Sequence, residues 1–182
     1  MRILFVGGTK FIGAAAVREA VRRGHEVTVF HRGETEADLP PDVRHVHSGT
    51  RAAGPILDYP AELRVLGANV VVHMVLLGAA DAQAAVDAFA GHTARLVAIS
   101  SADVYRAFDI VNERIDAPLE PVPLTEDSAL RDRPYPYRGT PDTPAHYEDY
   151  DKILAERTVS SHAELPTTVL RLPMMLGPGD PQ

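Results

Sequence analysis

Three glycines near the start of the chain have the spacing of a phosphate-binding turn. Gly7, Gly8 and Gly13 lie between an apolar run and a stretch with apolar residues at helical spacing. Here Gly7 permits a tight turn, Gly13 lets the helix pack closely on a sheet, and the N–H groups at the helix start form an anion site. The pattern predicts that the pyrophosphate of a dinucleotide binds to the whole turn, which comprises Gly7, Gly8, Thr9, Lys10, Phe11, Ile12 and Gly13.

Lys10 occupies the position of the usual middle glycine in this pattern. A side chain there narrows the approach of the backbone to the phosphates, although its ammonium group could itself pair with them.

The tip of the second predicted strand bears on the choice of cofactor. An acidic residue there would bind the ribose hydroxyls of NAD, but this chain has His31 followed by Arg32. Arg32 is either a solvated loop residue or a partner for the 2′-phosphate of NADP. Because the acid that would select NAD is missing and Arg32 can pair with a 2′-phosphate, the sequence favours NADP over NAD.

The eight histidines do not predict a metal centre. His45 and His47 share one face of a predicted strand and could in principle bind metal. No acidic residue or further histidine is spaced along the sequence to complete their site, so we expect none. His73 lies in the apolar run Val70–Val75, where a core histidine near the cofactor cleft is expected.

Alternating apolar runs and amphipathic stretches predict the elements that position these residues. The expected strands are Arg2–Val6, Glu26–Phe30, Arg44–His47, Val70–Met74, Arg95–Ser100 and Thr167–Arg171. The expected helices are Phe11–Arg23, Ala79–Ala90 and one near Glu148–Ser161, and residues 106–147 should form an irregular excursion. The fold class is therefore α/β, a doubly wound parallel sheet of about six strands with helices on both faces. Ligands of such sheets bind at the carboxyl ends of the strands.

Length and composition limit the classes of function. A chain of 182 residues fits one domain, spanning 1–182. The net charge of −7 makes nucleic acid an improbable partner, and the absence of cysteine excludes thiol chemistry. No apolar run is long enough for a membrane span, so we expect a cytoplasmic protein with no membrane partner. The oligomeric state is left open.

Several segments resemble the extended short-chain dehydrogenase/reductase family, which includes the nucleotide-sugar epimerases and dehydratases. Residues 100–105 (SSADVY) are similar to its S-S-x-x-V-Y-G segment, and residues 152–156 (KILAE) to its K-x-x-x-E motif. Residues 171–180, with Gly177, Pro178, Gly179 and Asp180, are similar to its R-x-x-x-x-x-G-P-G-D stretch. The glycine turn most resembles an atypical branch containing the chloroplast stem-loop-binding proteins and many bacterial members called NAD-dependent epimerase/dehydratase.

The resemblance implies a catalytic serine, tyrosine and lysine. Ser101 takes the place of the serine and Lys152 that of the lysine, but the residue four positions before Lys152 is Glu148. On a helix Tyr150 would point about 200° away from Lys152, so Tyr150 reaches the site only if the helix begins near Asp151. Asp103 aligns with an acid of the dehydratases, but we expect a solvated loop carboxylate there. The resemblance further implies cofactor contacts at Thr50, Arg51, Met74, Ser100, Lys152, Leu172 and Pro173.

Full-length members of the family continue into a smaller substrate-binding lobe, whereas this sequence stops at Gln182. We therefore expect that lobe to be absent or truncated. The resemblance implies an oxidoreductase or epimerase that acts on a small sugar-like or nucleotide-linked substrate, and Arg32 favours NADP as its cofactor. A non-catalytic dinucleotide-binding module is the alternative. A third possibility, RNA binding like that of the stem-loop-binding relatives, has the acidic net charge against it.

Overall fold

The computed structural model describes residues 1–35, 37–141, 143–178 and 180. It contains a six-stranded sheet in the order β3-β2-β1-β4-β5-β6, and every pair of neighbouring strands is parallel. The strands are β1 (Arg2–Val6), β2 (Glu26–His31), β3 (Arg44–His47), β4 (Val70–His73), β5 (Arg95–Ser101) and β6 (Thr167–Leu172). The α/β doubly wound fold expected from the sequence is confirmed.

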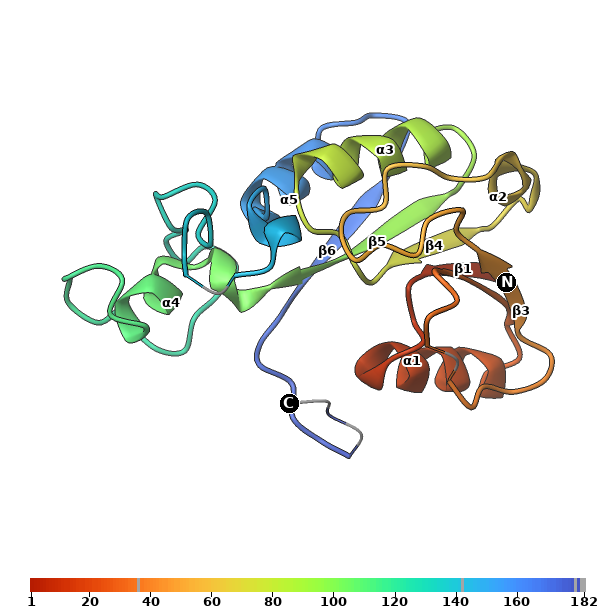
Figure 1. The fold of residues 1–182 in the computed structure, drawn as a ribbon, viewed down its shortest axis with the longest axis horizontal. Coiled ribbons are helices and arrows are strands. Elements are labelled where there is room, and N and C mark those ends of the chain that lie inside the picture. The colour runs from red at the N-terminus through yellow and green to blue at the C-terminus, as the bar shows by residue number, and fades with distance from the viewer. Residues whose placement is uncertain (36, 142, 179, 181–182) are drawn as a thin grey trace.

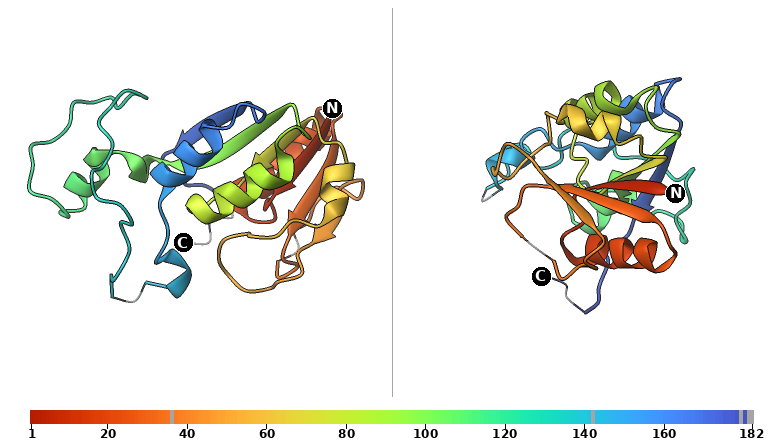
Figure 2. Two further views of the ribbon diagram at one scale, coloured as in Figure 1. Left: turned by 90° about the horizontal axis from the view of Figure 1, so that it is seen from above. Right: turned by 90° about the vertical axis from the view of Figure 1, so that its right-hand side faces the viewer.

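Helices cover both faces of the sheet (Figures 1 and 2). Helix α1 (Phe11–Arg22) lies on one face, and α2 (Ala61–Val65), α3 (Ala79–Phe89) and α5 (Lys152–Ser160) lie on the other. Residues alternate between faces along a strand, and β1 divides its side chains accordingly. Leu4 and Val6 join the core beneath α3 and α5, while Ile3 and Phe5 join the core beneath α1. Burial on both faces explains why this strand is a continuous apolar run.

The strand boundaries predicted from the sequence are correct to within one residue, but the helices differ more. Helix α2 was not predicted, because its five residues are too short for a helical period to be visible. Residues 106–147 are largely irregular, as expected, but also contain the short helix α4 (Arg106–Val111) and a 3₁₀ turn at Ala145–Tyr147. This segment extends away from the end of β5 (green to teal in Figures 1 and 2).

Helix α5 begins at Lys152 rather than near Glu148. Asp151 is its N-cap residue, since the Asp151 carboxylate accepts hydrogen bonds from the backbone N–H groups of Ile153 and Leu154. Tyr150 therefore lies on the segment that leads into the helix, which is the condition under which the sequence allowed it to reach the catalytic site.

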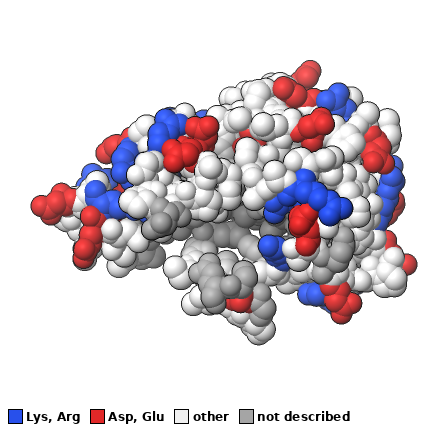
Figure 3. Space-filling view, viewed as in Figure 1, with Lys and Arg blue, Asp and Glu red and all other residues white. Residues whose placement is uncertain are grey.

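In the part of the chain described, no helix combines the length and apolar character needed to cross a membrane. On the face shown in Figure 3, the Lys and Arg side chains are interspersed with Asp and Glu side chains. The acidic side chains on this face do not form a single patch.

Candidate functional site

Two residues of the glycine turn have a backbone that only glycine adopts without strain. Gly7 and Gly8 have φ angles of +83° and +109°, in the region that L side chains disfavour. Gly13 is required for a different reason, because a Cβ atom there would lie 2.6 Å from the Cα atom of Gly8. The turn and the first turn of α1 thus pack backbone against backbone. This geometry brings the start of α1 to the carboxyl end of β1, where the helix N–H groups face outward.

Lys10 is accommodated without strain although a glycine usually occupies its position. It is the N-cap residue of α1, with φ −128° and ψ 150°, an extended conformation open to any L-residue. Its side chain is exposed and lines the cavity beside the turn. The backbone therefore needs no glycine here, and a basic side chain lines the cavity beside the expected anion site.

A cavity of about 400 Å³ adjoins the glycine turn at the carboxyl ends of β1, β2 and β4. All seven turn residues, with His31, Arg32 and Met74, line it. The other predicted cofactor residues do not, namely Thr50, Arg51, Ser100, Lys152, Leu172 and Pro173. Lining residues that the sequence did not indicate are Glu34, Thr35, Ala53, Gly54, Ile56, Val75, Leu77, His146 and Tyr147. Most of these come from loops, where sequence gives little signal of which side chain turns inward.

Side chains of both charge signs lie at the β2 end of the cavity. One Arg32 guanidinium nitrogen donates to the backbone carbonyl of Arg51, at 3.4 Å. The exposed Glu34 carboxylate pairs with the Arg51 guanidinium at 3.6 Å. Thr50 and Arg51 thus lie on the loop against which Arg32 rests, outside the cavity lining. Glu34 is an acid near the cavity, three residues beyond the position where the sequence pattern places one.

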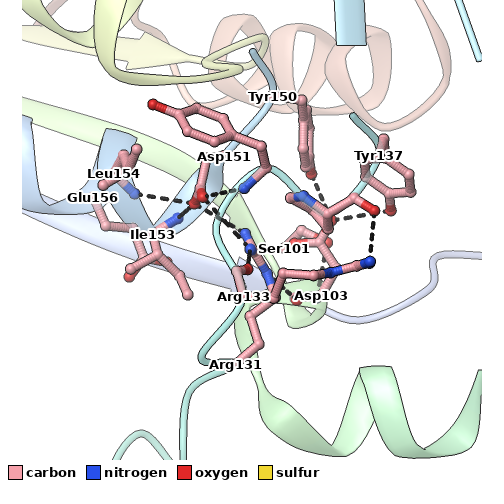
Figure 4. Close-up of polar contacts among 12 residues, drawn as sticks. Ser101, Asp103, Arg131, Arg133, Tyr137, Tyr150, Asp151, Ile153, Leu154 and Glu156 are labelled. Atoms are coloured by element: carbon pink, nitrogen blue, oxygen red, sulfur yellow. Dashed lines mark hydrogen bonds and ion pairs between the residues drawn. The ribbon is translucent and has the colours of Figure 1, made fainter. Parts of the chain in front are cut away.

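Tyrosines surround one buried carboxylate, that of Asp103, at the carboxyl end of β5 (Figure 4). The Tyr150 hydroxyl donates to Asp103 Oδ2 at 2.7 Å, and the Tyr137 hydroxyl donates to the same oxygen at 3.4 Å. Tyr147 packs its ring against both tyrosine rings and lines the cavity. The expectation of a solvated Asp103 is wrong, because the turn after β5 directs this side chain inward beneath the tyrosines.

The environment of Tyr150 strongly favours its neutral form. Burial raises the pKa of the Tyr150 hydroxyl well above its usual value, and the negative charge of Asp103 raises it further. The Lys152 ammonium group lies over the face of the Tyr150 ring, 5.8 Å from its centre. As the structure stands, Tyr150 holds a proton that its hydroxyl donates to Asp103.

Lys152 joins two strands at their carboxyl ends. Its buried ammonium group donates to the backbone carbonyl of Leu76, after β4, and at 3.1 Å to that of Ile99 in β5. Burial lowers the pKa of Lys152, while the charges of Asp103, Asp81 and Glu156 oppose that shift. The first residue of α5 therefore lies beside the cavity but does not line it.

The two serines of the SSADVY segment have different surroundings. Ser101 Oγ accepts a hydrogen bond from the Asp103 N–H at 3.2 Å and so caps the short turn after β5. Ser100 is buried, and its hydroxyl donates to Glu156 Oε1 at 2.5 Å. Arg171 forms an ion pair with Glu156 at 2.8 Å from the other side. The glutamate of the K-x-x-x-E motif thus joins β5, α5 and β6, which is a structural role. Gly179, from the glycine–proline motif, lies outside the described residues.

The strand order and the cavity at the switch point between β1 and β4 define the Rossmann class of α/β fold. No family model matches the sequence. A 2-alkyl-3-oxoalkanoate reductase from Stenotrophomonas maltophilia is 29% identical over 197 aligned positions, which span all of this chain and 53% of that protein.

Solved structures of NAD-dependent enzymes are also similar to this chain. The enzyme WbmG of Bordetella bronchiseptica, solved in complex with NAD, gives a TM-score of 0.63 at 21% identity over 94% of this chain and 52% of WbmG. TunA, an NAD-dependent NDP-hexosamine 5,6-dehydratase, gives 0.63 at 20% identity over 93% of this chain and 54% of TunA. The resemblance to epimerase/dehydratase-type enzymes is confirmed at the level of the fold. The chain spans about half the length of these relatives.

Proposed function

We propose that this chain is the dinucleotide-binding part of an NAD(P)-dependent oxidoreductase or epimerase. Its small substrate would be sugar-like or nucleotide-linked, bound mainly by a lobe outside these 182 residues. The observation that carries the proposal is the cavity at the carboxyl ends of β1, β2 and β4, bordered by the Gly7–Gly13 turn. Relatives described as NAD-dependent or solved with NAD support it. A cytoplasmic location is part of the proposal.

A bound dinucleotide would supply hydride transfer at its nicotinamide ring. In this proposal the chain's own residues bind the pyrophosphate at the glycine turn and control protons near β5. Tyr150 is the proposed proton donor and acceptor for the substrate oxygen, with Asp103 holding its hydroxyl and Ser101 orienting the substrate. Lys152 keeps the ends of β4 and β5 in register beside them. Reaction requires the Tyr150 hydroxyl to leave Asp103, since it cannot donate to both.

A Lys10→Glu substitution tests the phosphate site. Lys10 is exposed and its backbone is extended, so the fold should not depend on its side chain. We expect calorimetry to show at least about tenfold weaker NAD(P) binding, because one favourable charge contact of about 1.4 kcal/mol is replaced by repulsion. Arg64→Glu, on the exposed surface of α2, is a control with the same change of charge. Undiminished affinity in Lys10→Glu would contradict the proposed position of the pyrophosphate.

The choice between the two cofactors depends on Arg32 in this proposal. Its guanidinium group lies at the β2 end of the cavity, where a 2′-phosphate would be bound, so we expect NADP to bind more tightly than NAD. The Arg32→Ala variant should lose most of the difference, which we expect to be about tenfold, and Glu34→Gln should increase it. Equal affinities in the unmutated protein would refute this preference.

A non-catalytic dinucleotide-binding module is the second candidate. It is favoured by the hydrogen bond from Tyr150 to Asp103 and by the rise in the pKa of Tyr150, both of which oppose proton transfer. The two candidates differ in the effect of Tyr150→Phe on the protein with its natural downstream sequence. Loss of turnover with unchanged dinucleotide affinity supports the enzyme. Absence of turnover in the unmutated protein, with dinucleotide bound, supports the module.

A further inference from the structure

Three histidine side chains converge at the carboxyl ends of β2 and β3. His45 and His47 are two residues apart on β3 and share a face, and the parallel register pairs His47 with His31 of β2. The centre of the His31 ring lies 5.0 Å from the centre of the His45 ring and 4.7 Å from the centre of the His47 ring. The sequence showed only the pair on β3, because the third member is separated from it by a loop.

The nitrogen atoms of this histidine triad are close enough for one ion to reach all three. One ring nitrogen from each of His31, His45 and His47 lies within 4.8 Å of the other two. A tetrahedral zinc ion with Zn–N distances near 2.0–2.1 Å needs about 3.4 Å between its ligand atoms. His31 Nε2 and His45 Nδ1 are already 2.9 Å apart. The remaining separations, which are at most 4.8 Å, must close to about 3.4 Å when an ion binds.

We propose that the triad of His31, His45 and His47 is a binding site for a divalent transition metal of the zinc type. Imidazole nitrogen is a borderline ligand that suits zinc, copper, nickel and cobalt, and three histidines plus one open position is a known zinc arrangement. Burial graded from His31, which is buried, through His45 to the exposed His47 gives the ion a route in from solvent. A water molecule can supply the fourth ligand.

The contacts that the triad makes in this structure predict what binding would change. The Gly33 N–H donates to His31 Nδ1 at 3.2 Å, so the proton of that ring lies on Nε2, facing His45 Nδ1. A metal ion would take the place of this shared proton, and His31 would then carry its proton on Nδ1. The contact with Gly33 would be lost. Gly33 also lies against the His47 ring, because a Cβ atom added to Gly33 would lie 3.4 Å from Cδ2 of His47.

The test uses the untagged chain without dinucleotide, so that its result does not depend on the proposed cofactor function. We expect calorimetry to show one Zn²⁺ per chain and Zn²⁺ to raise the melting temperature. His47→Ala and His45→Gln should each weaken Zn²⁺ binding by more than about tenfold, since even partners outside a metal's ligand shell change affinity about 10- to 100-fold. The control is His92→Ala, an exposed histidine after α3, which should bind Zn²⁺ normally.

Two spectroscopic measurements distinguish a three-histidine site from surface adsorption. Bound Co²⁺ should show an intense visible d–d band, which indicates tetrahedral coordination, and the band should be lost in His47→Ala. The amide resonance of Gly33 should shift when Zn²⁺ binds. A Kd weaker than about 1 mM, or Zn²⁺ affinity that is the same in both triad variants and the unmutated chain, would overturn the proposal and leave the triad as a hydrogen-bonded cluster.

Discussion

Removing one partner of the ion pair between Arg131 and Asp151 should cause a large loss of stability near the site. The side chains are 0% and 2% exposed, and they join at 2.9 Å. Asp151 also caps α5 and accepts the Tyr135 N–H at 2.9 Å, so one carboxylate connects the 106–147 excursion to α5 (Figure 4). Removing this carboxylate leaves a buried guanidinium without its counter-charge.

The expected loss in the free energy of unfolding for Asp151→Ala is the sum of two parts. Breaking a buried ion pair by removing one partner costs about 3–5 kcal/mol. Arg131 keeps hydrogen bonds to the backbone carbonyls of Asp103 and Arg133, at 3.1 and 2.6 Å, so the lower end of that range applies. Loss of the helix cap adds about 1 kcal/mol, which gives about 4 kcal/mol in total. Asp151→Asn keeps an acceptor for the cap and should cost about 1 kcal/mol less.

Urea unfolding measures these differences in the free energy of unfolding. Asp58→Ala, at an exposed position, is the control and should change stability by no more than about 0.5 kcal/mol. The double variant Arg131→Met/Asp151→Asn removes both charges, so it should be more stable than the sum of the single variants predicts. A cost below about 1.5 kcal/mol for Asp151→Ala, or strict additivity in the double variant, would refute this reasoning.

Three further predictions concern other parts of the site. Gly13→Ala should lower both the melting temperature and dinucleotide affinity, because its Cβ would lie 2.6 Å from the Cα of Gly8; unchanged thermal melting and calorimetry would contradict this. Burial lowers the pKa of His73 to about 3, so as the pH falls below about 6.5 the unfolded chain takes up a proton that the folded chain does not. Stability should then fall by up to about 1.4 kcal/mol per pH unit, and unfolding curves of His73→Gln between pH 7 and 5 should show a weaker dependence. Tyr150→Phe should cost about 1.5–3 kcal/mol in urea unfolding, because the buried Asp103 carboxylate loses a donor; a neutral effect would mean that water replaces the hydroxyl.

The fold could be predicted from the sequence because its signals are local. The apolar run of β1 is buried on both faces and that of β4 is buried on one face and partly buried on the other. Gly7 and Gly13 mark a turn in which the start of α1 packs against the backbone of Gly8, five residues earlier than Gly13. The start of α5 was misplaced because a helical period does not reveal where a cap lies. Asp151 sets that boundary through its own hydrogen bonds.

The arrangement of the site could be predicted only in part, because it depends on contacts between distant segments. Asp103 is buried because Tyr137 and Tyr150, 34 and 47 residues further along the chain, lie over it. His31 joins His45 and His47 through the register of β2 against β3, which a pattern along one strand cannot reveal. The resemblance implies contacts at Thr50 and Arg51, whereas the residues that line the cavity come a few positions later in the same loop.

The start of α5 at Lys152 removes the expected separation of Tyr150 and Lys152 on opposite faces of a helix. A different property of the site opposes proton transfer by Tyr150. Tyr150 precedes α5, so the angle of about 200° that separated it from Lys152 does not apply. What now opposes proton transfer is electrostatic, since burial and the Asp103 charge both raise the pKa of the Tyr150 hydroxyl. A substrate oxygen that accepts the Tyr150 proton must therefore compete with a carboxylate 2.7 Å away. A tyrosinate next to Asp103 is disfavoured both as a starting base and as the product of proton donation, so the Tyr150 hydroxyl must move away from Asp103 before it can transfer a proton in either direction.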